Sequence, residues 1–95
     1  MPFINTTYVI GQSVTPLTTG DMYLLGINAD ELPYGYIDSM IRRFAGKTCT
    51  IKEIRKELIK INDDGYGFSW HASMFRESYK YALVTPIYNN VLSLS

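Results

Sequence analysis

The chain is predicted to fold as one small, mainly β domain with a single short helix. Between residues 48 and 71, three runs rich in β-branched and aromatic residues alternate with short polar turns, the pattern of an antiparallel meander. Its 95 residues suffice for one domain, and a composition of 46% hydrophobic and 19% charged residues is typical of a folded globule. We therefore expect one domain over residues 1–95, with the core in 8–85, an arm at 1–7 and a tail at 86–95.

The N-terminal third is predicted to contain one strand and one long connection. We expect the strand at Gln12–Leu17, where Pro16 favours a strand end or a sheet edge. The next residues, Thr18–Gly35, are interrupted by glycine, asparagine and proline, which predicts an irregular loop. Such a loop is either a binding element or a packed connection, and the pattern does not choose between them.

Helical periodicity predicts the one helix at Tyr36–Ala45. Gly46 follows it at the position where glycine commonly ends a helix. The apolar residues at i, i+3, i+4 and i+7 predict one buried face, made of Ile37, Met40, Ile41 and Phe44.

The meander is predicted to comprise strands at Thr48–Ile54, Leu58–Asn62 and Phe68–His71. Side chains alternate between the two faces of a strand, which predicts that five of them point toward the core: Cys49, Ile51, Ile59, Ile61 and Trp70. Ile54 has the opposite parity, which predicts a bulge or twist before a turn at Arg55-Lys56. We expect a helical turn at Ala72–Phe75 and a last strand at Tyr79–Thr85, whereas residues 86–95 form a frayed end or an edge strand. The predicted structural core is Ile37, Met40, Phe44, Cys49, Ile51, Ile59, Ile61, Trp70, Met74 and Phe75.

Charge is distributed unevenly, although the formal net charge is zero. Residues 1–41 carry four acidic and no basic side chains, whereas residues 42–60 carry seven basic and two acidic ones. Oppositely charged segments steer association, and basic side chains near an aromatic ring suit phosphate contacts and base stacking. We therefore predict a partner-binding surface made of Arg42, Arg43, Lys47, Lys52, Arg55, Lys56, Lys60 and Tyr66.

The residues available for chemistry predict that the protein is not an enzyme and has no cofactor. One cysteine, Cys49, and one histidine, His71, are too few for a zinc site. A Cys49–His71 dyad is disfavoured because a thiol turned into the core is inert. Asp63-Asp64-Gly65 lacks the remaining ligands of a calcium loop, so it is interpreted as a turn. No apolar run is long enough to span a membrane, and a lone cysteine suits a reducing compartment, so we expect a cytoplasmic protein.

The stretch MIRRFAGKTCTIKEI, followed by IKINDDGYGFSWHASMF, resembles a group of small phage-encoded proteins of SH3-like barrel fold. The strand order is also similar to the barrel repeat of Mind-bomb and related ubiquitin ligases, which binds peptide segments. The resemblance implies a strongly twisted antiparallel barrel of about five strands with one short helix. The segment Tyr8–Val14 resembles the first strand of the group, and the other matching positions are Met40, Ala45, Gly46, Lys47, Ile51, Ile61, Asp64, Trp70, Met74 and Phe75.

Together these observations predict a non-enzymatic binding module. The first hypothesis is a phage accessory protein that binds a host or viral protein and modulates or inhibits a host enzyme or defence system. The alternative is a nucleic-acid-binding barrel that uses residues 42–60, against which the zero net charge counts. In a third, weaker hypothesis the acidic third of one copy meets the basic segment of the next.

Overall fold

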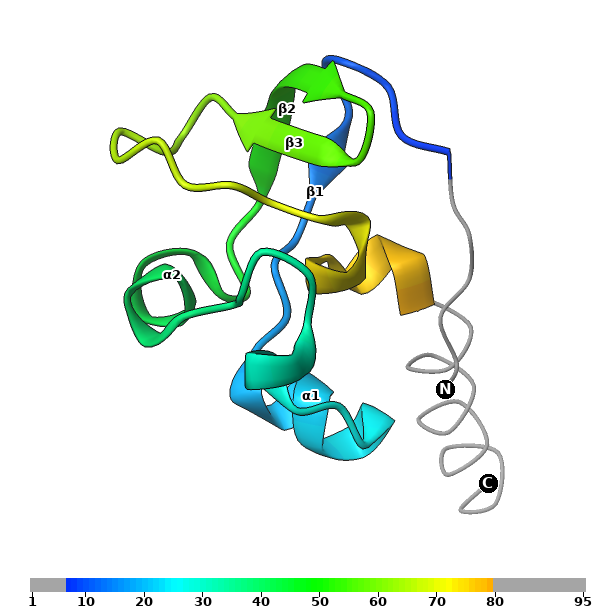
Figure 1. Ribbon diagram of the computed structural model, residues 1–95, viewed down its shortest axis with the longest axis vertical. Coiled ribbons are helices and arrows are strands. Elements are labelled where there is room, and N and C mark those ends of the chain that lie inside the picture. Colours follow the sequence, from blue (N-terminus) through cyan, green and yellow to red (C-terminus); the bar gives the residue numbers. More distant parts are fainter. Residues whose placement is uncertain (1–6, 80–95) are drawn as a thin grey trace, which may run out of the picture.

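The computed structural model describes residues 7–79, which form an open three-stranded antiparallel sheet, two α-helices and three short 3₁₀ helices. The sheet order is β1 (Ser13–Val14), β2 (Cys49–Arg55) and β3 (Leu58–Ile61). In Figure 1 the sheet lies at the top, α1 (Thr19–Leu25) at the bottom and α2 (Asp38–Phe44) to one side. The 3₁₀ helices are Ala29–Glu31, Ala72–Met74 and Arg76–Tyr79.

The prediction of a mainly β, SH3-like closed barrel is wrong. The described residues are 33% helical and 22% strand, and the sheet does not close. The predicted strand Phe68–His71 contributes only an isolated bridge between Trp70 and Ile59. Tyr79, expected to begin the last strand, ends a 3₁₀ helix. The arm at 1–6, the remainder of that predicted strand and the tail at 86–95 lie outside the described residues.

The predicted irregular loop at Thr18–Gly35 contains α1 and a 3₁₀ helix, so this prediction is also wrong. Thr18 and Asp21 form a reciprocal capping box at the start of α1, with both hydrogen bonds at 3.0 Å. Gly26 ends the helix in the left-handed conformation, at φ 68°. Thr18 and Gly26, which lie within the predicted loop, are therefore the two ends of a helix.

The helix predicted at Tyr36–Ala45 is confirmed as α2. One of its predicted core residues, Ile37, is exposed, so that part of the prediction is wrong. Ile37 is 51% exposed, because it is the extended N-cap and its side chain does not follow the helical face. Met40 and Phe44 are buried as predicted, and Ile41 packs against the core from a half-buried position.

The hairpin of β2 and β3 follows the predicted alternation. The register shifts between Ile51 and Glu53, which confirms an irregularity in β2. Arg55 pairs with Leu58, so the turn residues are Lys56 and Glu57, one position later than expected. The helical turn expected at Ala72–Phe75 is the 3₁₀ helix Ala72–Met74.

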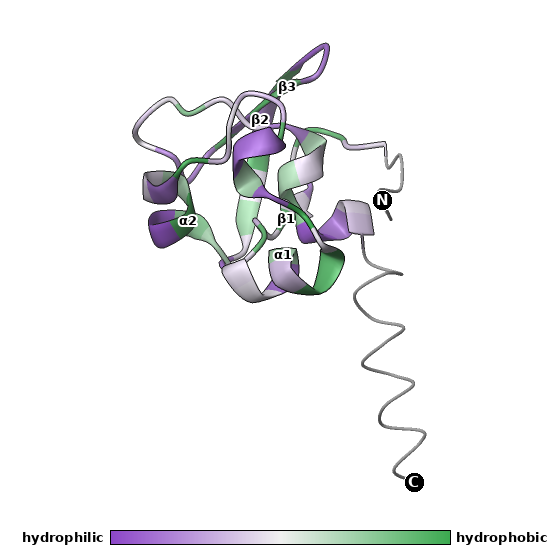
Figure 2. Cartoon of the chain, turned by 60° about the horizontal axis from the view of Figure 1, so that its bottom comes forward, coloured by the Kyte–Doolittle hydropathy of each residue, from purple (hydrophilic) through white to green (hydrophobic). Residues whose placement is uncertain are grey.

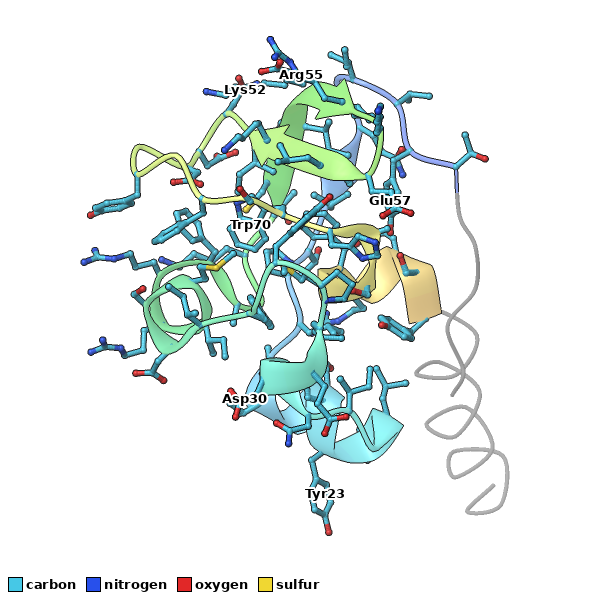
Figure 3. All side chains as sticks on the ribbon, in the orientation of Figure 1. Tyr23, Asp30, Lys52, Arg55, Glu57 and Trp70 are labelled. Atoms are coloured by element: carbon cyan, nitrogen blue, oxygen red, sulfur yellow. The ribbon has the colours of Figure 1, made fainter. Side chains whose placement is uncertain are left out.

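The core lies between the sheet, α2 and the 3₁₀ helices, with Trp70 at its centre (Figure 3). Trp70 stacks on Phe75 with ring centroids 5.6 Å apart, and Phe44 meets it edge-on at 5.5 Å. The hydroxyl of buried Tyr36 donates to the carbonyl of Leu17 at 2.7 Å. The other nine predicted core residues are 7% exposed or less: Met40, Phe44, Cys49, Ile51, Ile59, Ile61, Trp70, Met74 and Phe75.

Candidate partner-binding surface

The loop after β3 is built around the carboxylate of Asp64. This side chain is only 6% exposed. One oxygen accepts the backbone N–H of Tyr66 at 2.7 Å, and the other accepts the N–H of Phe68 at 2.8 Å and the indole N–H of Trp70 at 3.1 Å. Hydrogen bonds to a charged acceptor are stronger than neutral ones. The loop is therefore fixed to the core rather than loosely attached.

Lys60 holds the same loop from the other side. Its ammonium group donates to the carbonyl oxygens of Gly67 at 2.9 Å and Phe68 at 3.0 Å. Gly67 has φ 73°, a conformation that glycine adopts at little cost. Lys60 belongs to the predicted partner-binding set, and here its charged group supports the loop.

Tyr66 projects from this loop with 59% of its surface exposed. Its ring stacks on Phe68 with centroids 5.6 Å apart, and Phe68 meets Phe44 edge-on at 6.3 Å. The guanidinium of Arg43 lies 4.4 Å from the centroid of the Tyr66 ring, in a cation–π contact. An unbroken series of rings thus joins exposed Tyr66 to the buried core.

Beside this contact, α2 carries a hollow of about 270 Å³ lined by Ser39, Arg42 and Arg43. Residues three and four apart share one face of a helix, which brings the two arginines over Ser39. The Nε of Arg42 pairs with Asp38 at 3.1 Å. Among residues 7–79, no carboxylate lies within ion-pair distance of Arg43. We call Ser39, Arg42, Arg43 and Tyr66 the α2–loop surface.

The rest of the predicted basic set lies apart from the α2–loop surface. Lys52 and Arg55 project from the top of the hairpin, far from α2 in the view of Figure 3. Arg55 pairs with the nearby Glu53. Lys56 occupies the hairpin turn, and Lys47 is exposed between α2 and β2. The hairpin turn and part of α2 form separate hydrophilic regions in Figure 2. The structure thus joins Arg42, Arg43 and Tyr66 and separates them from the hairpin residues.

The acidic N-terminal third meets this surface at Asp38, which pairs with Arg42. Asp21 pairs with Arg76 at 2.8 Å, and Asp30 belongs to the 3₁₀ helix Ala29–Glu31, beside α1 in Figure 3. Among residues 7–79, no other acid before residue 42 forms an ion pair with the basic segment. The sequence analysis missed Asp38 and Ser39, which helical spacing relative to Arg42 and Arg43 would have brought to the same face.

His71 and Cys49 occupy structural positions. His71 Nδ1 accepts the backbone N–H of Ser73 at 3.1 Å and so caps the 3₁₀ helix Ala72–Met74. Cys49 is 1% exposed, and burial, together with the charge of Asp63, raises the pKa of its thiol to about 11. Within residues 7–79, no three histidine, cysteine or acidic side chains are close enough to hold a metal ion.

In the part of the chain that the structure describes, no helix has the length and apolarity to cross a membrane. Comparison with protein-family models, curated proteins and solved structures finds no match to this chain. The resemblance to small phage-encoded proteins therefore stays a prediction, without the closed barrel that it implied.

Proposed function

We propose that this protein is a non-enzymatic binding module that engages another protein through the α2–loop surface. The observation that carries the proposal is the position of Tyr66, exposed on a loop anchored by Asp64 and Lys60 and in contact with Arg43. Tyrosine and arginine are enriched among the residues that dominate binding energy. A side chain held in place before binding loses little conformational entropy on association.

The resemblance to phage-encoded proteins makes a host protein the partner that we expect, with modulation or inhibition of that protein as the outcome. We expect the interaction to take place in the cytoplasm, where the single thiol of Cys49 stays reduced. The proposal needs no catalytic group or cofactor from this chain.

The test is affinity capture from host-cell lysate with the wild-type protein and two tyrosine variants. Tyr66→Ala removes the exposed ring of the α2–loop surface. Tyr23→Ala removes a ring that is 86% exposed on α1, at the bottom of Figure 3 and outside the α2–loop surface, and it is the matched control. We expect one protein to be captured by the wild type and by Tyr23→Ala and to be lost with Tyr66→Ala. Equal capture by all three would exclude this surface as the binding site.

Nucleic-acid binding is the second candidate function, favoured by Arg43, which lies beside the exposed Tyr66 ring and has no acidic partner among residues 7–79. Single-stranded nucleic acid is bound along a continuous positive groove with rings open to its bases. Arg42 and Arg43 on α2 lie apart from Lys52, Arg55 and Lys56 of the hairpin, and the Tyr66 ring already contacts Phe68 and Arg43. Gel-shift titration with short RNA and DNA at several salt concentrations tests this function, since phosphate contacts make affinity fall steeply with salt.

A further inference from the structure

We propose that the hollow lined by Ser39, Arg42 and Arg43 receives a carboxylate from an acidic segment of the partner protein, and that Asp38 competes with it from within the chain. This inference rests on the proposed function, because it assumes that the α2–loop surface binds a protein. To the proposed function it adds two points: the bound segment is acidic, and Asp38 of this chain weakens its binding.

Arg42, one of the three residues that line the hollow, already binds a carboxylate at its exposed guanidinium. Asp38 already holds a carboxylate oxygen 3.1 Å from the Nε of Arg42. The two side chains are 74% and 82% exposed, and ion pairs between such exposed groups are weak. A carboxylate from another chain can therefore replace Asp38 at Arg42 at small cost.

Arg43 can also bind a carboxylate, because its guanidinium is already positioned by Tyr66. Its guanidinium stands over the Tyr66 ring, 4.4 Å from the ring centroid, and has no acidic partner among residues 7–79. A guanidinium that stacks on a ring can still direct N–H donors within its own plane toward a carboxylate. The hydroxyl of Ser39 adds a third donor at the hollow, whose volume of about 270 Å³ admits one acidic side chain.

The arrangement favours an acidic protein segment over a nucleic-acid backbone. Lys52 and Lys56, which form no ion pair within the described part of the chain, belong to the hairpin, and the hairpin lies apart from α2 and its two arginines in Figure 1. The surface thus offers one local site for an anion rather than a continuous track for successive phosphates.

The experiment measures binding of a fluorescent glutamate-rich peptide by anisotropy, with an oligothymidylate of equal charge as the second probe. Asp38→Asn should bind the peptide about two- to five-fold more tightly, because it frees Arg42 from an exposed pair. Asp30→Asn makes the same change in net charge at an exposed carboxylate that forms no ion pair with Arg42 or Arg43, and it should leave the affinity nearly unchanged. Arg43→Gln should weaken binding about ten-fold by removing charge-assisted hydrogen bonds.

Three results would overturn the inference. Equal gains from Asp38→Asn and Asp30→Asn would show a general charge effect rather than competition at Arg42. Tighter binding of the oligothymidylate with the same dependence on Arg43 would assign the surface to nucleic acid. Absence of peptide binding to both wild type and Asp38→Asn would exclude the acidic ligand. If lysate capture still depended on Tyr66 in that last case, the proposed function would stand and only the partner's chemistry would be wrong.

Discussion

The carboxylate of Asp64 accepts a hydrogen bond of 3.1 Å from the indole N–H of Trp70, a side chain with no exposed surface. The bond satisfies the one polar group of the largest core residue, and its acceptor also holds two N–H groups of the following loop. Core packing and loop shape therefore depend on the same carboxylate. Because Tyr66 extends from that loop, the binding surface depends on it as well.

Replacement of Asp64 by asparagine should destabilise the protein strongly. The amide keeps one oxygen acceptor, but its NH₂ group faces N–H donors that then lack an acceptor. We expect a loss of about 1.5–3 kcal/mol in the free energy of unfolding, measured by urea denaturation. The neighbouring Asp63 is exposed and accepts one backbone N–H, from Thr50, so Asp63→Asn is the control and should cost less. Equal losses in the two variants would contradict the role given to Asp64.

Acid should destabilise the protein partly through Asp21. Burial alone raises the pKa of this carboxyl, but hydrogen bonds from Thr18 and Arg76 and the charge of Arg76 outweigh it, so the pKa lies below its usual value. Near the ordinary carboxyl pKa of about 4 the unfolded chain then binds more protons than the folded one. The stabilisation is present above that pH and is lost as the pH falls through the lower folded pKa.

Urea denaturation of wild type and Asp21→Asn across this acid range provides the measurement. The difference in the free energy of unfolding between wild type and Asp21→Asn should become smaller as the pH falls. Asp30→Asn, which changes an exposed carboxylate at the N-terminus of a 3₁₀ helix, serves as the control. A gap between wild type and Asp21→Asn that does not change with pH would contradict the prediction.

The thiol of Cys49 should resist alkylation in the folded protein. Burial raises its pKa to about 11, above the ordinary value of about 8.5 that applies in the unfolded chain. The neutral thiol therefore stabilises the folded state fully below the unfolded pKa, and this contribution is lost as the pH rises toward the folded pKa. Reaction with an aromatic disulfide reagent should be slow in native buffer and fast in urea. Rapid native-state reaction would show that Cys49 is accessible.

Lys56→Asn should stabilise the hairpin. Lys56 has φ 56° in the turn between β2 and β3, a left-handed conformation that costs most residues about 1–2 kcal/mol and that asparagine adopts more readily. We expect a gain of about 0.5 kcal/mol in urea denaturation, part of the penalty for a left-handed residue. Lys52→Asn removes the same charge from an exposed position of β2 and should give no gain, because asparagine is disfavoured in strands. A loss of stability in Lys56→Asn would rule out strain at this turn.

Patterns within single elements were sufficient to predict the buried positions in much of the chain. Alternation in the hairpin, the helical spacing of Met40 and Phe44 and the inward position of Cys49 all follow from side-chain geometry within one element. The ends of α1 were also readable, since Thr18 and Asp21 have the spacing of a capping box and Gly26 that of a helix end. The wrong loop prediction there came from interpreting Gly26, together with the other glycine, asparagine and proline residues of the segment, as a sign of irregular structure.

The number of strands and the extent of the surface were decided by contacts between distant parts of the chain. Phe68–His71 has the composition of a strand, yet Asp64 takes the N–H of Phe68 that a ladder would need, so only one bridge forms at Trp70. The basic residues from Arg42 to Lys60 lie in one stretch of the sequence, but in the fold they are divided between α2 and the hairpin. The sequence alone thus determined most of the side chains that are buried in the hairpin and in α2. Tertiary packing decided how the sheet ends and which charges meet, because both depend on competition for hydrogen bonds and space between separate elements.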